Sequence, residues 1–86
     1  GKDYTDGTGD RLSNFKGHAN ELGIAPRVVW WIYFSKHLDA ILTWVREGAV
    51  ASEPVEWRFA DARNYLDLGR AILEEEIQNA ILDKVR

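Results

Sequence analysis

The residues of this chain whose types and spacing could do chemistry gather in the stretch SEPVEWRFADARNYLDL, residues 52–68. Asp61 and Asn64 lie about one helical turn apart in it. On a helix they share an arc with Trp57 and Tyr65 rather than a plain polar face, so another part of the molecule is expected to pack against them. A carboxylate in such a strip must be neutralised, hydrogen-bonded or bound to a metal, because desolvating it alone costs several kcal/mol.

Partners for Asp61 are expected from the preceding helix, whose narrow polar stripe contains Lys36 and Asp39. Two interpretations of these residues are open. In one, Lys36 and Asp61 form a structural salt bridge, and the amide of Asn64 makes a hydrogen bond. In the other, a polar cleft that binds a charged ligand is lined by Glu53, Asp61, Asn64, Lys36 and Asp39.

Helices must position these residues, because apolar residues recur at spacings of three and four and no stretch alternates like a β-strand. The first helix is expected to start at Asp10, a good N-cap, and to end at Gly23. The second is expected over residues 26–47. It is apolar over so much of its circumference that it should be buried from two sides, with His37 packed and hydrogen-bonded among aromatic residues.

The third helix is expected to start at Ser52 or Glu53, with Pro54 in its first turn, and to continue to the end of the chain. With about 33 residues it would be about 50 Å long, which is more than the other two helices can cover. Its C-terminal half is therefore expected either to pack on a partner subunit or to bend back at Gly69. Its main apolar face is expected to consist of Val55, Phe59, Ala62, Leu66, Gly69 and Leu73.

The sequence thus predicts an all-α fold. We expect a three-helix protomer with a long C-terminal helix, in an intertwined helical-bundle homo-oligomer that is a dimer or a tetramer. Residues 1–9 are expected to form a flexible loop and residues 10–86 a single helical domain. A chain of 86 residues with 45% hydrophobic residues and four Trp carries more apolar surface than so small a core can bury, which is a second reason to expect an oligomer.

Charge and composition argue against several classes of protein. A net charge of −3 does not suit a nucleic-acid partner, and the Trp-rich second helix is a poor reader of base edges, so a small DNA-associated regulator is the weakest of the functions considered. The absence of cysteine removes disulfides and thiolate sites. No apolar run approaches the roughly 18 residues of a membrane span, and the polar N-terminus has no signal-peptide pattern. A cytoplasmic protein without membrane contact is expected.

Several sequence motifs occur in an order that points to a family. They are GKDYTDGTGDRLSNF, then LGIAP, then YFSKHLDAI, then a connector with glycine, then SEPVEWRFADARNYLDL. In this order the chain resembles small phage and bacterial proteins of the nucleotide-modification-associated group. Those are similar in turn to the MazG-type all-α nucleoside triphosphate pyrophosphohydrolases. The resemblance covers roughly residues 2–75.

The resemblance implies a cleft between long helices that binds a nucleotide and Mg²⁺, in a dimer or tetramer. The reaction would be hydrolysis of a nucleoside or deoxynucleoside triphosphate to the monophosphate and pyrophosphate. Mg²⁺ held by carboxylates would neutralise phosphate charge and activate water. The implied catalytic residues are Glu53 and Asp61, which with Asp39 would also be the metal ligands. The implied substrate-binding residues are Lys36, Asn64, Trp57 and Tyr65.

The chain departs from the MazG-type pattern at the acidic residues. That pattern has EExxE on one helix and ExxD on the next, whereas this sequence has Lys36-x-x-Asp39 and Arg58-x-x-Asp61. Fewer anionic ligands predict weaker Mg²⁺ binding. The alternative function is therefore a non-catalytic helical oligomerisation or interaction protein, of phage or mobile-element origin, with a degenerate nucleotide cleft.

Overall fold

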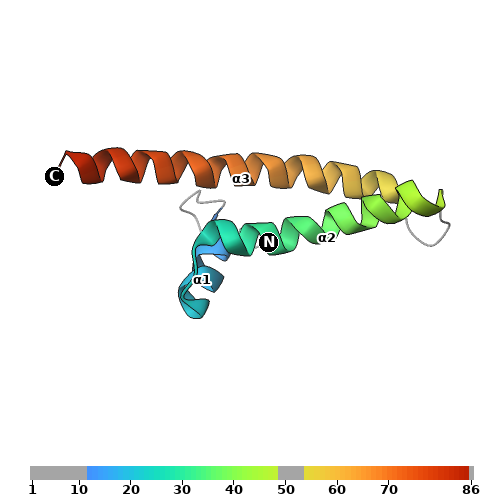
Figure 1. The fold of residues 1–86 in the computed structure, drawn as a ribbon, viewed down its shortest axis with the longest axis horizontal. Helices are drawn as coiled ribbons and strands as arrows, with labels where there is room; N and C mark the ends of the chain where they lie inside the picture. Colours follow the sequence, from blue (N-terminus) through green and yellow to red (C-terminus); the bar gives the residue numbers. More distant parts are fainter. Residues whose placement is uncertain (1–11, 49–53, 86) are drawn as a thin grey trace, which may run out of the picture.

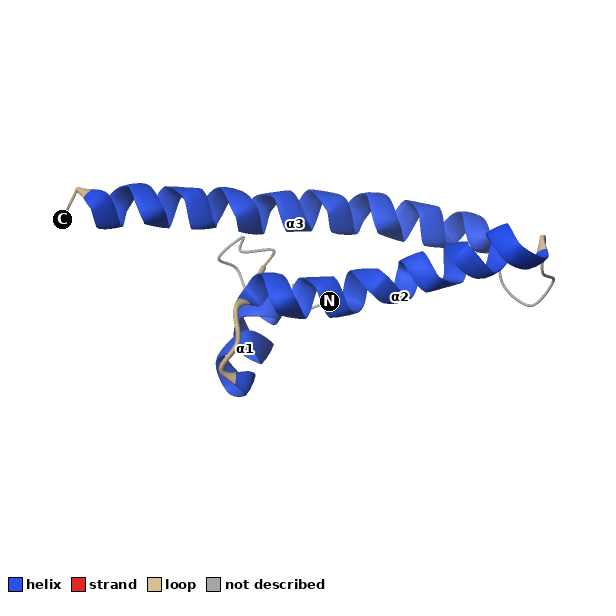
Figure 2. Cartoon of the chain, in the orientation of Figure 1, coloured by secondary structure: helices blue, strands red, loops and turns tan. Residues whose placement is uncertain are grey.

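The computed structural model describes residues 12–48 and 54–85 of the chain. These residues form three helices, α1 (Ser13–Leu22), α2 (Pro26–Glu47) and α3 (Val55–Lys84), and contain no strand (Figure 1; Figure 2). The prediction of an all-α, three-helix chain is therefore confirmed for the described part. The loop predicted for residues 1–9 lies outside the described residues, as do Asp10, Ser52 and Glu53. The helix starts predicted at these residues are wrong, because α1 begins at Ser13 after an N-cap at Leu12, and α3 begins at Val55 after an N-cap at Pro54.

Glycine and proline set the ends of the first two helices. Gly23 has φ 69° and ψ 33°, a left-handed conformation that glycine adopts at little cost, and the N–H of Ile24 donates to the carbonyl of Ala19 at 3.0 Å. Pro26 then takes the first turn of α2, where its missing N–H leaves no helical hydrogen bond unmade. At the other end of α2, Gly48 has φ 78°. The second helix thus has the bounds that the sequence predicts.

α3 is one uninterrupted helix of 30 residues. It passes through Gly69 without a break, so the alternative in which the helix bends back there is wrong (Figure 1). Pro54 is the N-cap of α3, whereas the sequence predicts that Pro54 lies in the first turn of this helix. At 1.5 Å per residue α3 is about 45 Å long and α2 about 33 Å. The C-terminal end of α3 therefore extends past the other two helices (Figure 1).

α2 and α3 pack antiparallel as a long hairpin, and α1 packs against α2 (Figure 1). The apolar face predicted for α3 meets α2 along one edge only: Ala62 and Gly69 lie at the seam. Phe59, Leu66 and Leu73 stay 43%, 55% and 54% exposed. The side chains of α3 at the seam with α2 instead follow a spacing of three and four along a neighbouring strip: Arg58, Ala62, Tyr65, Gly69, Ile72 and Glu76.

The indole of Trp30 decides which side of α3 packs. Its Nε1–H donates to the carbonyl oxygen of Tyr65 at 2.6 Å, and its ring stacks on Phe34 with centroids 5.1 Å apart. A Cβ on Gly69 would stand less than 3.0 Å from three atoms of that ring. Only glycine leaves room there, so α3 turns its Tyr65–Gly69 side toward α2.

The buried core is small and lies where the three helices meet. Its cluster consists of Leu12, Phe15, Ala19, Val29 and Ile72. The radius of gyration is 16.0 Å, whereas a compact domain of this length would have about 12 Å, so the molecule is elongated. Within residues 12–48 and 54–85, no helix combines the length and the hydropathy needed to cross a membrane.

Candidate functional site

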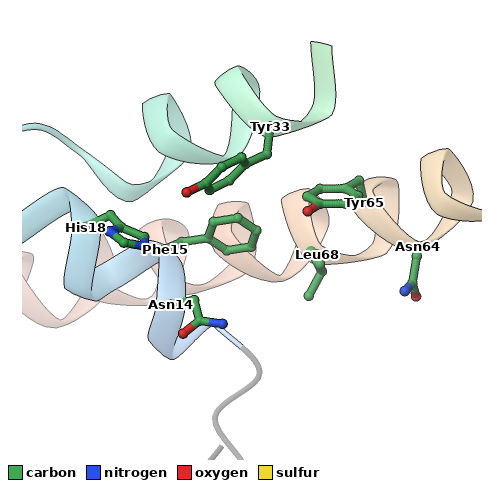
Figure 3. Close-up of a pocket in the computed structure, with 7 residues that line it drawn as sticks. All are labelled: Asn14, Phe15, His18, Tyr33, Asn64, Tyr65 and Leu68. Atoms are coloured by element: carbon green, nitrogen blue, oxygen red, sulfur yellow. The ribbon is translucent and has the colours of Figure 1, made fainter. Parts of the chain in front are cut away.

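An open hollow of about 330 Å³ lies where the three helices meet. Aromatic and amide side chains make up most of its wall, and they come from all three helices. The lining residues are Asn14, Phe15 and His18 on α1, Tyr33 on α2, and Asn64, Tyr65 and Leu68 on α3 (Figure 3). This hollow is the candidate functional site.

Three aromatic rings form the fixed wall of the hollow. The ring of Phe15 lies 6.0 Å from that of Tyr33, tilted by 44°, and 6.1 Å from that of Tyr65 in an edge-to-face arrangement (Figure 3). Phe15 is only 5% exposed, and it anchors α1 on the other two helices. Rings held at such distances and angles attract one another beyond their burial, so the wall is preorganised.

Polar groups stand at the edge of the hollow. Asn14 and His18 are four residues apart on α1 and therefore lie on the same side of that helix. Asn64 projects from α3 at the other end of the hollow (Figure 3). All three side chains are exposed, and each amide offers both donors and an acceptor, so a ligand in the hollow can reach either kind of group.

Asp61 lies close to the hollow, at the seam between α2 and α3. Its Oδ2 is 3.7 Å from Nδ1 of His37, and its side chain is 51% exposed. The His37 ring lies 4.9 Å from the Tyr65 ring, and Nη1 of Arg58 is 3.4 Å from the same Nδ1. The structure thus pairs Asp61 with His37 instead of the predicted Lys36. The reason is that α3 packs on the side of α2 that carries His37. The sequence-based prediction that His37 is packed among aromatic residues is in line with this contact.

The other predicted substrate-binding residues divide into two groups. Asn64 and Tyr65 line the hollow directly. Lys36 lies beside it, with its Nζ 5.9 Å from the centroid of the Tyr33 ring, a cation–π arrangement. Trp57 is 67% exposed and lies about two turns before Tyr65 on α3, away from the hollow.

The residues predicted as metal ligands do not form a ligand group within the described part of the chain. Glu53 lies outside the described residues. Asp39 is exposed on α2, where its carbonyl accepts a hydrogen bond from Thr43 Oγ1 at 3.0 Å, and Asp61 faces His37. In the part of the chain that the structure describes, no three His, Cys, Asp or Glu side chains are close enough to hold a metal ion. The described residues by themselves therefore do not fit the Mg²⁺ that the resemblance implies.

Five residues of the hollow are not among the predicted site residues: Asn14, Phe15, His18, Tyr33 and Leu68. A signal exists for two of them, because Asn14 and His18 border the apolar stripe of α1 at a spacing of four. Spacing within α1 cannot tell which helix its polar edge faces. That depends on the left-handed turn at Gly23 and on how α1 then packs against α2.

Burial raises the pKa of the Tyr65 hydroxyl above its usual value of 10.0, and the nearby negative charge of Asp61 and the Tyr33 hydroxyl raise it further. The folded chain therefore keeps the Tyr65 proton at a pH at which the unfolded chain has lost it. A group of this kind contributes stability that is fully present below the unfolded pKa and is lost as pH rises through the folded pKa.

The free energy of unfolding is accordingly expected to fall as pH rises above about 10, and part of that fall should be absent in Tyr65→Phe. Phenylalanine keeps the ring contacts with Phe15 and His37 but has no proton to lose. The measurement is urea unfolding of both proteins over a range of alkaline pH. Identical pH dependence in the two would contradict the prediction.

Comparison with protein-family models, with curated proteins and with solved structures gives no match for this chain. The resemblance to the nucleotide-modification-associated and MazG-type proteins therefore rests on sequence motifs such as KHLDAI and SEPVEWRFADARNY. The function has to be argued from these motifs together with the hollow and the side chains around it.

Proposed function

We propose that this chain is a nucleotide-binding protein and that the hollow between α1, α2 and α3 receives the base. The observation that carries the proposal is the placement of three aromatic rings and two amides, from three helices, around one cavity of about 330 Å³. Small-molecule sites have volumes of about 300–1,000 Å³ and combine apolar walls with a few polar groups. A single planar ring system suits the lower end of that range.

A nucleobase matches the hollow in shape and in chemistry. Its faces stack on aromatic rings at about 1–3 kcal/mol per base, and Tyr33 and Tyr65 offer such rings. Its edges carry both donors and acceptors, which asparagine amides complement. Asn14 and Asn64 line the hollow from two different helices, so a base in the hollow has an amide toward either end of it.

The lysine beside the hollow favours a nucleotide over an uncharged base. Lys36 is exposed, and its ammonium lies over the ring of Tyr33, which is itself part of the wall. A phosphate group that leaves the hollow past Tyr33 would meet this ammonium and form a charge-assisted hydrogen bond. The lysine of α1, Lys16, is already paired with Glu75 at 3.0 Å.

Asn64→Ala is expected to weaken nucleotide binding about fivefold to tenfold, because one hydrogen bond with a net value of about 1 kcal/mol is lost. Asn20→Ala is the matched control, since Asn20 is an exposed asparagine on α1 that does not line the hollow. The measurement is calorimetric titration with nucleosides, monophosphates and triphosphates of each base, with and without Mg²⁺. Absence of binding across this panel, or an equal effect of the two substitutions, would overturn the proposal.

Hydrolysis of the bound nucleotide is the second candidate, and the His37–Asp61 pair is the observation that favours it. An imidazole oriented by a carboxylate can act as a general base. Nδ1 of His37 lies 3.4 Å from the donor Arg58 Nη1 and 3.7 Å from Asp61 Oδ2, so Nε2 is open to accept a proton from water in the tautomer that carries its proton on Nδ1 and points it toward Asp61. This pair lies next to Tyr65, hence next to the proposed base site.

An assay of pyrophosphate release separates the two candidates. The protein is incubated with nucleoside and deoxynucleoside triphosphates, with and without Mg²⁺. Release that is lost in His37→Gln and Asp61→Asn, while nucleotide still binds, supports a pyrophosphohydrolase of the MazG-like kind. Binding without any release supports the non-catalytic nucleotide-binding protein.

A further inference from the structure

One side of the α2–α3 hairpin carries large apolar side chains that no described residue covers. Their exposed fractions run from 36% to 64%. We call them the apolar face, and its members are Trp31, Leu38, Leu42 and Val45 on α2, and Phe59, Leu66, Leu73, Ile77 and Ile81 on α3. In both helices the members are separated by three, four or seven residues, so each set forms a stripe along one side of its helix.

The two stripes form one surface across the hairpin. The rings of Trp44 and Phe59 meet edge to face with centroids 5.9 Å apart, which joins α2 to α3 near the hairpin end. Toward the other end, a mainly apolar slot is lined by Trp30 from α2 and by Leu66 and Leu73 from α3. The apolar face is therefore continuous between the helices.

α1 lies on the opposite side of the hairpin. It contacts α2 through Tyr33, whose ring is 6.0 Å from that of Phe15. Tyr33 and Trp31 are two residues apart, which places them about 200° apart around α2. Within the described residues, α1 thus covers one side of the hairpin and no helix covers the other side.

We infer that a second copy of this chain covers the apolar face, so that α2 and α3 of two copies form a four-helix core. This inference does not depend on the proposed nucleotide site. With side chains of roughly 150–200 Å² each, half exposed, the nine residues present on the order of 800 Å². The largest apolar patch of a typical monomer is about 300–600 Å², and a stable dimer buries about 800 Å² per partner.

The projecting end of α3 also offers apolar surface to a partner. Arg27, in the first turn of α2, bonds Glu76 at 2.8 Å, so the residues of α3 after Glu76 lie beyond the end of α2 (Figure 1). All of them up to Val85 are exposed, and α3 continues to Lys84. Ile77 and Ile81 continue the apolar face into this segment, so a partner seated on that face covers it too.

The charges that border the apolar face suit a copy of the same chain. Asp39 and Arg46 lie beside the stripe on α2, and Arg70 and Glu74, joined at 3.2 Å, lie beside the stripe on α3. A partner of a single charge sign would be repelled by half of this border. A second copy related by a twofold axis presents the same apolar face with the same mixed charges at its border. A C2 interface needs this kind of self-complementary surface.

The test is the mass of the chain in solution, measured by analytical ultracentrifugation over a range of concentrations. The wild type is expected to form a species of twice 9.8 kDa. Leu66→Glu and Leu73→Glu should each raise the dissociation constant at least about 100-fold, because each places a charge in the apolar centre on both copies. Trp57→Glu is the control, since Trp57 is exposed on another side of α3 and should leave the dimer intact.

Crosslinking keeps the inference testable if the monomeric variants unfold. The chain has no cysteine, so Leu66→Cys or Trp57→Cys introduces the only thiol. A bifunctional maleimide should trap a dimer through Leu66→Cys and not through Trp57→Cys. A wild type that stays monomeric at millimolar concentration would overturn the inference, as would a dimer that Trp57→Glu dissociates and Leu66→Glu does not. Neither result bears on nucleotide binding, which is measured separately.

Discussion

Gly69→Ala is expected to destabilise the chain by about 2 kcal/mol, although alanine favours a helix by about 1 kcal/mol over glycine. The added Cβ would stand less than 3.0 Å from the Trp30 indole, a rigid ring that is stacked on Phe34 and would have to shift to make room. Overpacking of this kind costs about 1–3 kcal/mol. Moving the indole would also lengthen its 2.6 Å hydrogen bond to the Tyr65 carbonyl, at about 1 kcal/mol more.

Gly17→Ala is the matched control for this effect. Gly17 is exposed in the middle of α1, and a Cβ there has no atom within 4 Å. The same substitution should therefore stabilise the chain by about 0.5–1 kcal/mol, through helix propensity alone. Thermal unfolding followed by circular dichroism measures both, and the melting temperature should fall by roughly 10 °C for Gly69→Ala. A stabilising Gly69→Ala would show that α3 does not pack on Trp30.

Phe15→Ala is expected to destabilise the chain by about 3–5 kcal/mol, which is a large part of the stability of so small a domain. Phe15 is 5% exposed and is the aromatic side chain by which α1 holds to both tyrosines. Its loss leaves a cavity in the core and removes the central wall of the hollow. Nucleotide binding should be lost together with stability.

Leu22→Ala on the same helix serves as the comparison. Leu22 is exposed at the end of α1, so its truncation should change the free energy of unfolding by no more than about 0.5 kcal/mol. Urea unfolding of the two variants gives the stabilities, and titration with the nucleotides that bind the wild type gives the affinities. Equal effects of the two substitutions would mean that α1 is not anchored through Phe15.

The sequence predicts which part of α3 contributes to the candidate site, but it does not predict which residues of the other helices complete it. The stretch around Asp61, Asn64 and Tyr65 is the one that the structure brings to the hollow, because its polar residues fall in an aromatic arc of α3. The residues that complete the hollow come from α1 and α2, such as Asn14 and Tyr33. Their positions around one cavity follow from how helices distant in the sequence pack, and spacing within one helix carries no information on that.

The sequence by itself determined the helices. Pro26 and Gly48 bound α2 through backbone restrictions that act within one or two residues, and the absence of a strong breaker lets α3 run on through Gly69. Local conformational preference is enough for these features, since each depends on residues that are neighbours in the chain.

Only the tertiary structure decided which face of α3 packs on α2 and which side chain pairs with Asp61. By apolar content the stripe of Phe59, Leu66 and Leu73 was the expected inner face, yet it stays exposed. The rigid indole of Trp30 lies over Gly69, which is 39 residues later in the chain. This contact sets the rotation of α3 about its axis, and in that rotation Asp61 faces His37. The shape match between two rigid groups on different helices sets this rotation, and hydrophobic periodicity does not record shape.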